Sequence, residues 1–193
     1  EQNVEIMTED IFQLMKFLKI NKASFIGFSM GGAVAFQMAL SHPENVDKLV
    51  ILNSGPDFNN AKDSGLDILG ERTKIIKEQG FNTLAQTISA GMFPEDKQKE
   101  WRDEFEQRIV SNDEDAYLKT FGELMNWGMG KKISEIPHQT LVIASDMDYT
   151  PVDYKKSYTE KMQHAKLVVI ENSRHGVVLD QAEKLNEELL KFL

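Results

Sequence analysis

One short segment of the sequence has the residue types and the spacing for nucleophilic chemistry. Residues 27–31 read GFSMG, which fits the pattern G-x-S-x-G, and a further glycine, Gly32, follows. A serine on a sharp strand-to-helix turn has a strained backbone, so small residues are expected before and after it. The helix that follows directs its N-terminus at the serine oxygen, and the backbone N–H of Met30 is expected to stabilise an oxyanion there. Ser29 is therefore the candidate nucleophile.

A serine nucleophile needs a general base, and the sequence offers four histidines. His175 follows the apolar run 166–170 by a short polar loop and precedes a glycine. Functional groups gather in loops at the carboxyl ends of parallel strands, so His175 is the candidate base. The other three histidines lie beside a proline or in a polar turn: His42, His138 and His164.

The base needs an acid that orients it, and two aspartates compete for this role. The apolar run 140–144 is followed by Ser145-Asp146-Met147-Asp148. Either carboxylate would give the chain order serine, aspartate, histidine, which enzymes with this type of serine turn use. From the residues alone, both Asp146 and Asp148 remain candidates.

Strands and helices alternate along the chain, which is typical of the α/β class with a parallel sheet flanked by helices. Thr8 is the expected cap of a first helix, and a final helix ends the chain. Apolar runs and helical spacing predict strands at 24–28, 48–53, 140–144 and 166–170, and helices at 29–41 and about 152–163. Residues 57–133 interrupt the alternation with apolar residues at helical spacing, so we expect an all-helical insertion.

Three stretches of the sequence resemble the α/β-hydrolase superfamily: GFSMGG, SDMDYTP and ENSRHGVVLDQAEKLNEELLKFL. The resemblance covers nearly the whole chain, loosely across the insertion. It implies a hydrolase core made of residues 1–56 and 134–193, with residues 57–133 as a helical lid. In this family the acid stands in Gly-x-x-Asp with a proline soon after. The family pattern therefore favours Asp148 over Asp146, although Ser145 replaces the glycine.

The resemblance and the residues together imply a serine hydrolase that transfers an acyl group to water, with no cofactor and no metal. A small, apolar carboxylic ester is the expected substrate, and thioesters and lactones are close alternatives. We expect Phe28 and Met30 to form the floor of its pocket. The roof would come from apolar residues that could equally be the core of the lid itself: Met92, Phe93, Met125, Trp127 and Met129.

Two alternative functions would keep the same three side chains. The superfamily includes a lyase that catalyses an elimination and lactonases that open enol-lactone rings. Such anionic substrates call for arginines near the site, and Arg174 is a candidate. The second alternative is a ligand-binding or signalling protein that retains the three side chains and turns over slowly.

Composition argues against several classes of protein. The 193 residues include 22 Lys+Arg and 31 Asp+Glu, a net charge of −9, so a nucleic-acid partner is not expected. Without cysteine the sequence has no disulfides and no thiolate nucleophile, which fits a cytoplasmic location. No apolar run approaches the ~18 residues of a membrane span.

Only one predicted helix and one short strand precede Ser29. In the superfamily, a loop upstream of the serine supplies the second oxyanion donor. We therefore expect the strand at 24–28 to lack a neighbour on one side. The chain would then be the C-terminal part of a longer hydrolase, or would complete its sheet with another chain, for example as a homo-oligomer.

Overall fold

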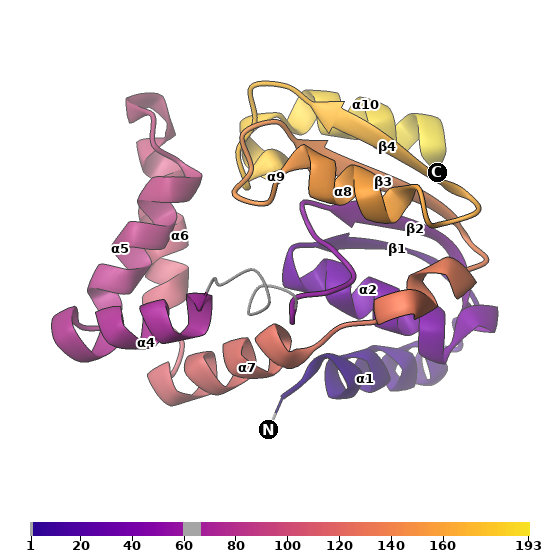
Figure 1. The fold of residues 1–193 in the computed structure, drawn as a ribbon, viewed down its shortest axis with the longest axis horizontal. Helices are drawn as coiled ribbons and strands as arrows, with labels where there is room; N and C mark the ends of the chain where they lie inside the picture. The colour runs from indigo at the N-terminus through magenta and orange to yellow at the C-terminus, as the bar shows by residue number, and fades with distance from the viewer. Residues whose placement is uncertain (1, 60–66) are drawn as a thin grey trace. The chain divides into compact units, whose positions relative to one another are not determined.

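The computed structural model describes residues 2–59 and 67–193, which form two compact units (Figure 1). One unit contains the sheet and comprises Asn3–Asp57 and Trp127–Leu193. The other is the described part of Phe58–Asn126 together with Gln2.

The sheet has four parallel strands in the order β1-β2-β3-β4. Their bounds are Ala23–Phe28 for β1, Val46–Leu52 for β2, Gln139–Ser145 for β3 and Ala165–Ile170 for β4. The predicted α/β class and the parallel sheet flanked by helices are confirmed. Since Phe28 pairs with Leu52 and Ser145 with Ile170, the carboxyl ends of all four strands lie at one edge of the sheet.

Helices cover both faces of this sheet. On one face α2 (Met30–Ser41) and α8 (Val152–Thr159) meet through Phe36 and Tyr158, whose rings pack edge to face with centroids 6.0 Å apart. On the other face, Val177 of α9 (Val177–Asp180) and Leu185 of α10 (Ala182–Phe192) join a core cluster with buried residues of β2 and β3. Figure 1 shows α8 and α10 on opposite sides of the sheet. Two short 3₁₀ helices, η1 (Pro43–Asn45) and η3 (Gly130–Glu135), also belong to this unit.

The first helix begins earlier than predicted. α1 spans Val4–Phe17, and its N-cap is Asn3, whose side chain accepts a hydrogen bond from the Ile6 N–H at 2.8 Å. Thr8, the predicted cap, lies buried within α1, where its hydroxyl donates to the Val4 carbonyl at 2.7 Å. The prediction of Thr8 as the cap was wrong because Val4 is itself buried, which extends the apolar face by a turn.

Strand β1 differs from the strands at the centre of the sheet. Within the described residues it pairs with β2 alone, as the sequence predicted for one side of this strand. Ile26 of β1 is 48% exposed, whereas β2 and β3 are buried along most of their length.

The second unit is built from helices, which are α4 (Ile68–Gln79), α5 (Phe81–Met92), η2 (Asp96–Gln98), α6 (Lys99–Val110) and α7 (Glu114–Asn126). Phe93 lies in its interior, with ring centroids 6.0 Å from Trp101 and 6.1 Å from Phe105. Residues 127–133, which the sequence assigned to the insertion, lie with the sheet unit. There the Met129 N–H donates to the Pro56 carbonyl at 2.9 Å.

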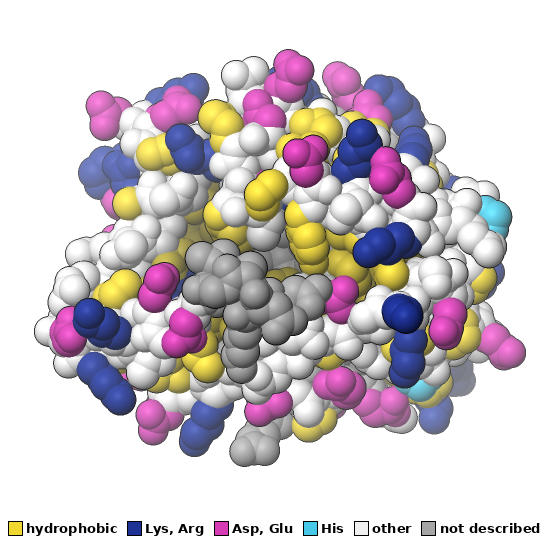
Figure 2. Space-filling view, in the orientation of Figure 1, with side chains coloured by type: hydrophobic (Ala, Val, Ile, Leu, Met, Phe, Trp, Pro, Cys, Tyr) yellow, Lys and Arg dark blue, Asp and Glu magenta, His cyan; other side chains and the backbone are white. Residues whose placement is uncertain are grey.

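Acidic and basic side chains are intermingled on the face of the molecule that Figure 2 draws.

None of the helices in residues 2–59 and 67–193 has the length and apolar character needed to cross a membrane.

Candidate active site

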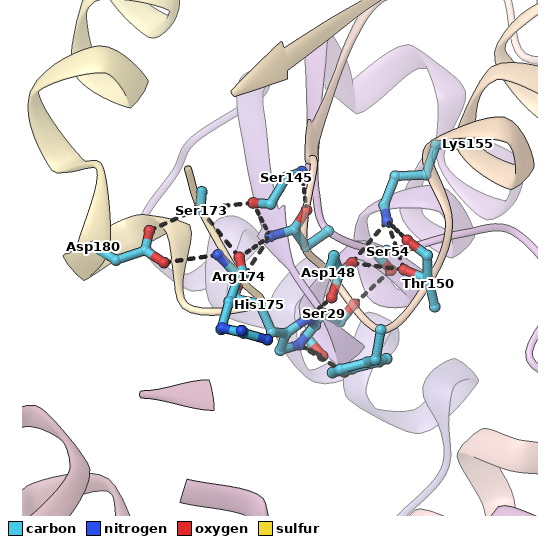
Figure 3. A network of polar contacts seen from close by, with 12 residues as sticks. Ser29, Ser54, Ser145, Asp148, Thr150, Lys155, Ser173, Arg174, His175 and Asp180 are labelled. Atoms are coloured by element: carbon cyan, nitrogen blue, oxygen red, sulfur yellow. Dashed lines mark hydrogen bonds and ion pairs between the residues drawn. The ribbon is translucent and has the colours of Figure 1, made fainter. Parts of the chain in front are cut away.

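Three side chains from loops at the carboxyl edge of the sheet form a continuous hydrogen-bonded chain (Figure 3). His175 Nε2 lies 3.0 Å from Ser29 Oγ, and His175 Nδ1 lies 2.8 Å from Asp148 Oδ1. Ser29 follows β1, Asp148 follows β3 and His175 follows β4. The structure thus brings together the serine, the histidine and the favoured aspartate, although they are far apart in sequence.

Ser29 stands on a strained turn between β1 and α2, with φ 52° and ψ −120°. The turn leaves little room nearby. A Cβ on Gly27 would lie 2.3 Å from the Gly31 carbonyl oxygen, and one on Gly32 would lie 2.4 Å from Ser54 Cβ. Gly31, in contrast, has open space where a Cβ would go. Space therefore requires the glycine before the serine, Gly27, but not the one expected after it, Gly31; the further glycine, Gly32, is required by its contact with Ser54.

Two predicted residues flank Ser29 directly. Met30 is the first residue of α2, and N–H groups in the first turn of a helix lack partners within the helix. Phe28 is half-buried at the end of β1, and its ring centroid lies 5.0 Å from that of His175. A backbone donor and an apolar ring thus lie on either side of the serine.

The two candidate aspartates have different partners. The Asp148 side chain is fully buried and contacts His175, whereas Asp146 accepts hydrogen bonds from the N–H groups of Asn172 and Ser173 at 3.0 and 3.1 Å. Burial would raise the pKa of Asp148, but the hydrogen bonds and charges of His175 and Lys155 outweigh it and keep the pKa below its ordinary value. Asp146 instead holds the loop that leads to His175.

A buried hydrogen-bond network that the sequence did not predict holds the loop that leads to His175. Asn53 follows β2, and its amide donates to Ser145 Oγ at 2.7 Å and to the His175 carbonyl at 3.0 Å. Asp180 of α9 accepts from Ser173 Oγ at 2.7 Å and from the Arg174 N–H at 2.9 Å. The one signal in the sequence was the position of Asn53 at the end of a strand.

Tyr149 also contacts the site, and the sequence did not predict it. Its hydroxyl lies 2.7 Å from His175 Nε2, and the two rings have centroids 4.2 Å apart. Two hydroxyls, those of Tyr149 and Ser29, therefore contact the same imidazole nitrogen. The place of Tyr149 next to Asp148 in the sequence was the available signal.

The other residues predicted to bind substrate are all buried: Met92, Phe93, Met125, Trp127 and Met129. In the sheet unit, Trp127 Nε1 donates to Gln37 Oε1 of α2 at 2.9 Å. Their contact with a substrate stays a prediction. In the part of the chain that the structure describes, no group of three acidic or histidine side chains is placed to hold a metal ion.

A family model described as the alpha/beta hydrolase fold matches residues 3–182. The chain belongs to the α/β-hydrolase family. A 2-hydroxy-6-oxononadienedioate/2-hydroxy-6-oxononatrienedioate hydrolase of Comamonas testosteroni is 29% identical, over 100% of this chain and 70% of the relative.

Solved α/β-hydrolase structures share the fold. An esterase from Exiguobacterium antarcticum has a TM-score of 0.88 at 23% identity, covering 98% of this chain and 73% of the esterase. The enol-lactonase from Burkholderia xenovorans has a TM-score of 0.87 at 19% identity, covering 99% of this chain and 73% of the lactonase. The family match and the Comamonas testosteroni relative support a hydrolase of the α/β-hydrolase superfamily, and the solved structures show its fold.

Proposed function

We propose that this α/β-hydrolase is a serine esterase that cleaves a small carboxylic ester through an acyl-enzyme. The observation that carries the proposal is the hydrogen-bonded chain from Ser29 through His175 to Asp148, at 3.0 and 2.8 Å. Nucleophile, base and orienting acid need this mutual geometry.

In the first half of the reaction, Ser29 Oγ attacks the ester carbonyl carbon while His175 Nε2 takes its proton. Asp148 accepts the Nδ1–H of His175, which fixes the tautomer with a free lone pair on Nε2 and stabilises the imidazolium that forms. The Met30 N–H donates to the carbonyl oxygen as it becomes an oxyanion. The tetrahedral intermediate collapses, the bond to the alcohol oxygen breaks, and His175 returns its proton to that oxygen.

In the second half, water replaces the alcohol. His175 Nε2 takes a proton from the water as its oxygen attacks the acyl carbon on Ser29. The bond between Ser29 Oγ and the acyl carbon then breaks, Ser29 regains the proton from His175, and the acid leaves. Phe28 and Met30 are apolar neighbours of the serine, which favours an apolar acyl group.

Labelling of the full chain with a fluorophosphonate probe tests the proposal. We expect phosphonylation of Ser29, mapped by peptide mass spectrometry, and no labelling of Ser29→Ala. Ser157→Ala is the matched control because Ser157 is an exposed serine on α8. A labelled residue other than Ser29, or no labelling of the folded chain, would contradict the proposal.

A panel of aryl esters of different acyl length, with a thioester and a lactone, then tests the substrate class. Steady turnover that is fastest on a carboxylic ester supports the esterase. Fastest opening of the lactone favours the lactonase alternative. Stoichiometric labelling without turnover on any member of the panel favours a ligand-binding protein.

A further inference from the structure

A buried lysine lies behind the acid of the proposed site. Lys155 of α8 has a side chain that is 0% exposed, and its Nζ lies 2.7 Å from Asp148 Oδ2. The same Nζ lies 2.6 Å from both the carbonyl oxygen and the hydroxyl of Thr150. These three acceptors match the three N–H bonds of an ammonium group, so the charged form is fully hydrogen-bonded.

The two oxygens of Asp148 have separate partners. Oδ1 accepts from His175, while Oδ2 accepts from Lys155 and from the Thr150 hydroxyl at 2.6 Å (Figure 3). A lysine is rarely buried, because removing its charge from water is costly unless a partner compensates. Burial lowers the pKa of Lys155, and the ion pair with Asp148 opposes that fall. The mechanism proposed above gives this lysine no role.

We propose that Lys155 is a positioning residue that acts through Asp148 and sets the lower pH limit of the reaction. This inference rests on the proposed function. With Asp148 ionised, Lys155 charged and His175 neutral, the three groups sum to zero charge. A proton on His175 would bring the sum to +1. The positive charge of the Lys155 ammonium makes that protonation less favourable. Lys155 therefore keeps His175 free to act as a base at a lower pH than Asp148 alone would allow.

The other groups around Asp148 leave this charge balance intact. Among the described residues, Lys155 is the cation that forms an ion pair with Asp148 Oδ2, and His175 Nδ1 contacts Oδ1. Tyr158 of α8 is fully buried, and burial together with Tyr154 and Asp148 holds its pKa well above the ordinary value, so it stays neutral. Burial likewise raises the pKa of Tyr154 to about 12. Tyr149 faces His175 with a hydroxyl.

Two substitutions at Lys155 and one neighbouring control test the proposal. Lys155→Met removes the charge and the donors, and Lys155→Gln removes the charge but keeps an N–H donor. Lys156→Met is the control, because Lys156 is the next residue on α8 and its side chain is 64% exposed. The measurement is the rate of fluorophosphonate labelling of Ser29, and kcat/KM on an aryl ester, from pH 5 to pH 9.

We expect the midpoint of the acidic limb to rise by about one pH unit in both Lys155 variants and to stay in place in Lys156→Met. A lower plateau with an unchanged midpoint in both variants would mean a structural role only and would overturn the proposal. A midpoint restored by Lys155→Gln would overturn it too, because the donor rather than the charge would then matter.

The unsubstituted chain gives a further test if neither Lys155 variant folds by circular dichroism. The midpoint of its labelling rate against pH is expected below about pH 7.5, because the Lys155 ammonium opposes a further positive charge at the site. A midpoint above about pH 7.5 would overturn the proposal, because an aspartate unopposed by a cation favours the imidazolium. Absence of Ser29 labelling at every pH would overturn the proposed function itself, a result distinct from an unmoved midpoint.

Discussion

Asp146 and Asp148 are two residues apart and carry the same carboxylate, yet their contacts predict different roles. We expect Asp148→Asn to lower kcat on an aryl ester by a factor on the order of 10⁴, because the amide favours the wrong tautomer of His175. Asp146→Asn keeps one of the two oxygens that accept from the loop N–H groups and does not contact His175, so its loss should stay below about tenfold. Equal losses in the two variants, both verified as folded, would remove Asp148 from the proposed mechanism.

Tyr149 competes with Ser29 for the same nitrogen. Its hydroxyl is 2.7 Å from His175 Nε2, compared with 3.0 Å for Ser29 Oγ. A neutral imidazole accepts at one nitrogen only, so the tyrosine hydrogen bond must break before Ser29 can transfer its proton. We expect Tyr149→Phe to raise kcat/KM by up to about fivefold, the worth of one hydrogen bond of ~1 kcal/mol. A loss of tenfold or more would mean that the hydroxyl assists the reaction.

The sequence predicted Ser29, His175 and the two aspartates Asp146 and Asp148 because each follows an apolar run typical of a parallel strand, and the family pattern then favoured Asp148. The residues that hold them could not be found in the same way. In the sequence, Lys155 is one half of a Lys-Lys pair of the kind usually found exposed. Its burial against Asp148 depends on which face of α8 is turned inward. Asn53 contacts residues far along the chain, and that contact depends on the order of β2 and β3 in the sheet.

Among the secondary-structure elements, α2 offers a matched pair of glycines at its start. Gly32→Ala would bring a Cβ to within 2.4 Å of Ser54 Cβ, whereas Gly31→Ala meets nothing within 4 Å. We expect Gly32→Ala to lower the free energy of unfolding by about 1–3 kcal/mol, the usual cost of overpacking. Gly31→Ala should leave it unchanged or raise it by up to about 1 kcal/mol, because alanine favours the helix. Urea unfolding measures both, and a larger loss in Gly31→Ala would contradict the packing around Ser54.

The sequence predicted the ends of the strands more accurately than the start of the first helix. The strands were predicted to within about two residues, because each is an apolar run, and β2 and β3 are buried along most of their length. The start of α1 was misplaced because Asn3 and Thr8 are both residue types that cap helices. Which of them lies at the end depends on the burial of Val4, and this is a property of the packed protein.

For the whole molecule, the two aspartates predict how stability varies with pH. Burial opposes ionisation of both aspartates, but backbone hydrogen bonds to Asp146, and hydrogen bonds and charges at Asp148, keep the pKa of both below the ordinary value of 3.8. The unfolded chain therefore takes up protons first as the pH falls. The contribution of these groups is complete above about pH 5 and is lost as the pH falls through their folded values.

We expect the urea midpoint to fall between pH 5 and pH 3, and to fall less steeply in Asp146→Asn. Asp10→Asn serves as the control, because Asp10 is exposed on α1. Identical slopes for the two variants would show that the loop contacts of Asp146 do not stabilise the fold.

The backbone of Ser29 has a consequence for how this chain would evolve. At φ 52° and ψ −120°, residue 29 has a conformation that costs a side-chain-bearing residue about 1–3 kcal/mol and a glycine far less. Ser29→Gly should therefore be more stable in urea than Ser29→Ala, which keeps the strain without the hydroxyl. In a lineage released from the need for the activity, drift to glycine at position 29 would be thermodynamically downhill. Under the proposed function, a serine retained at this position would record selection for activity acting against selection for stability.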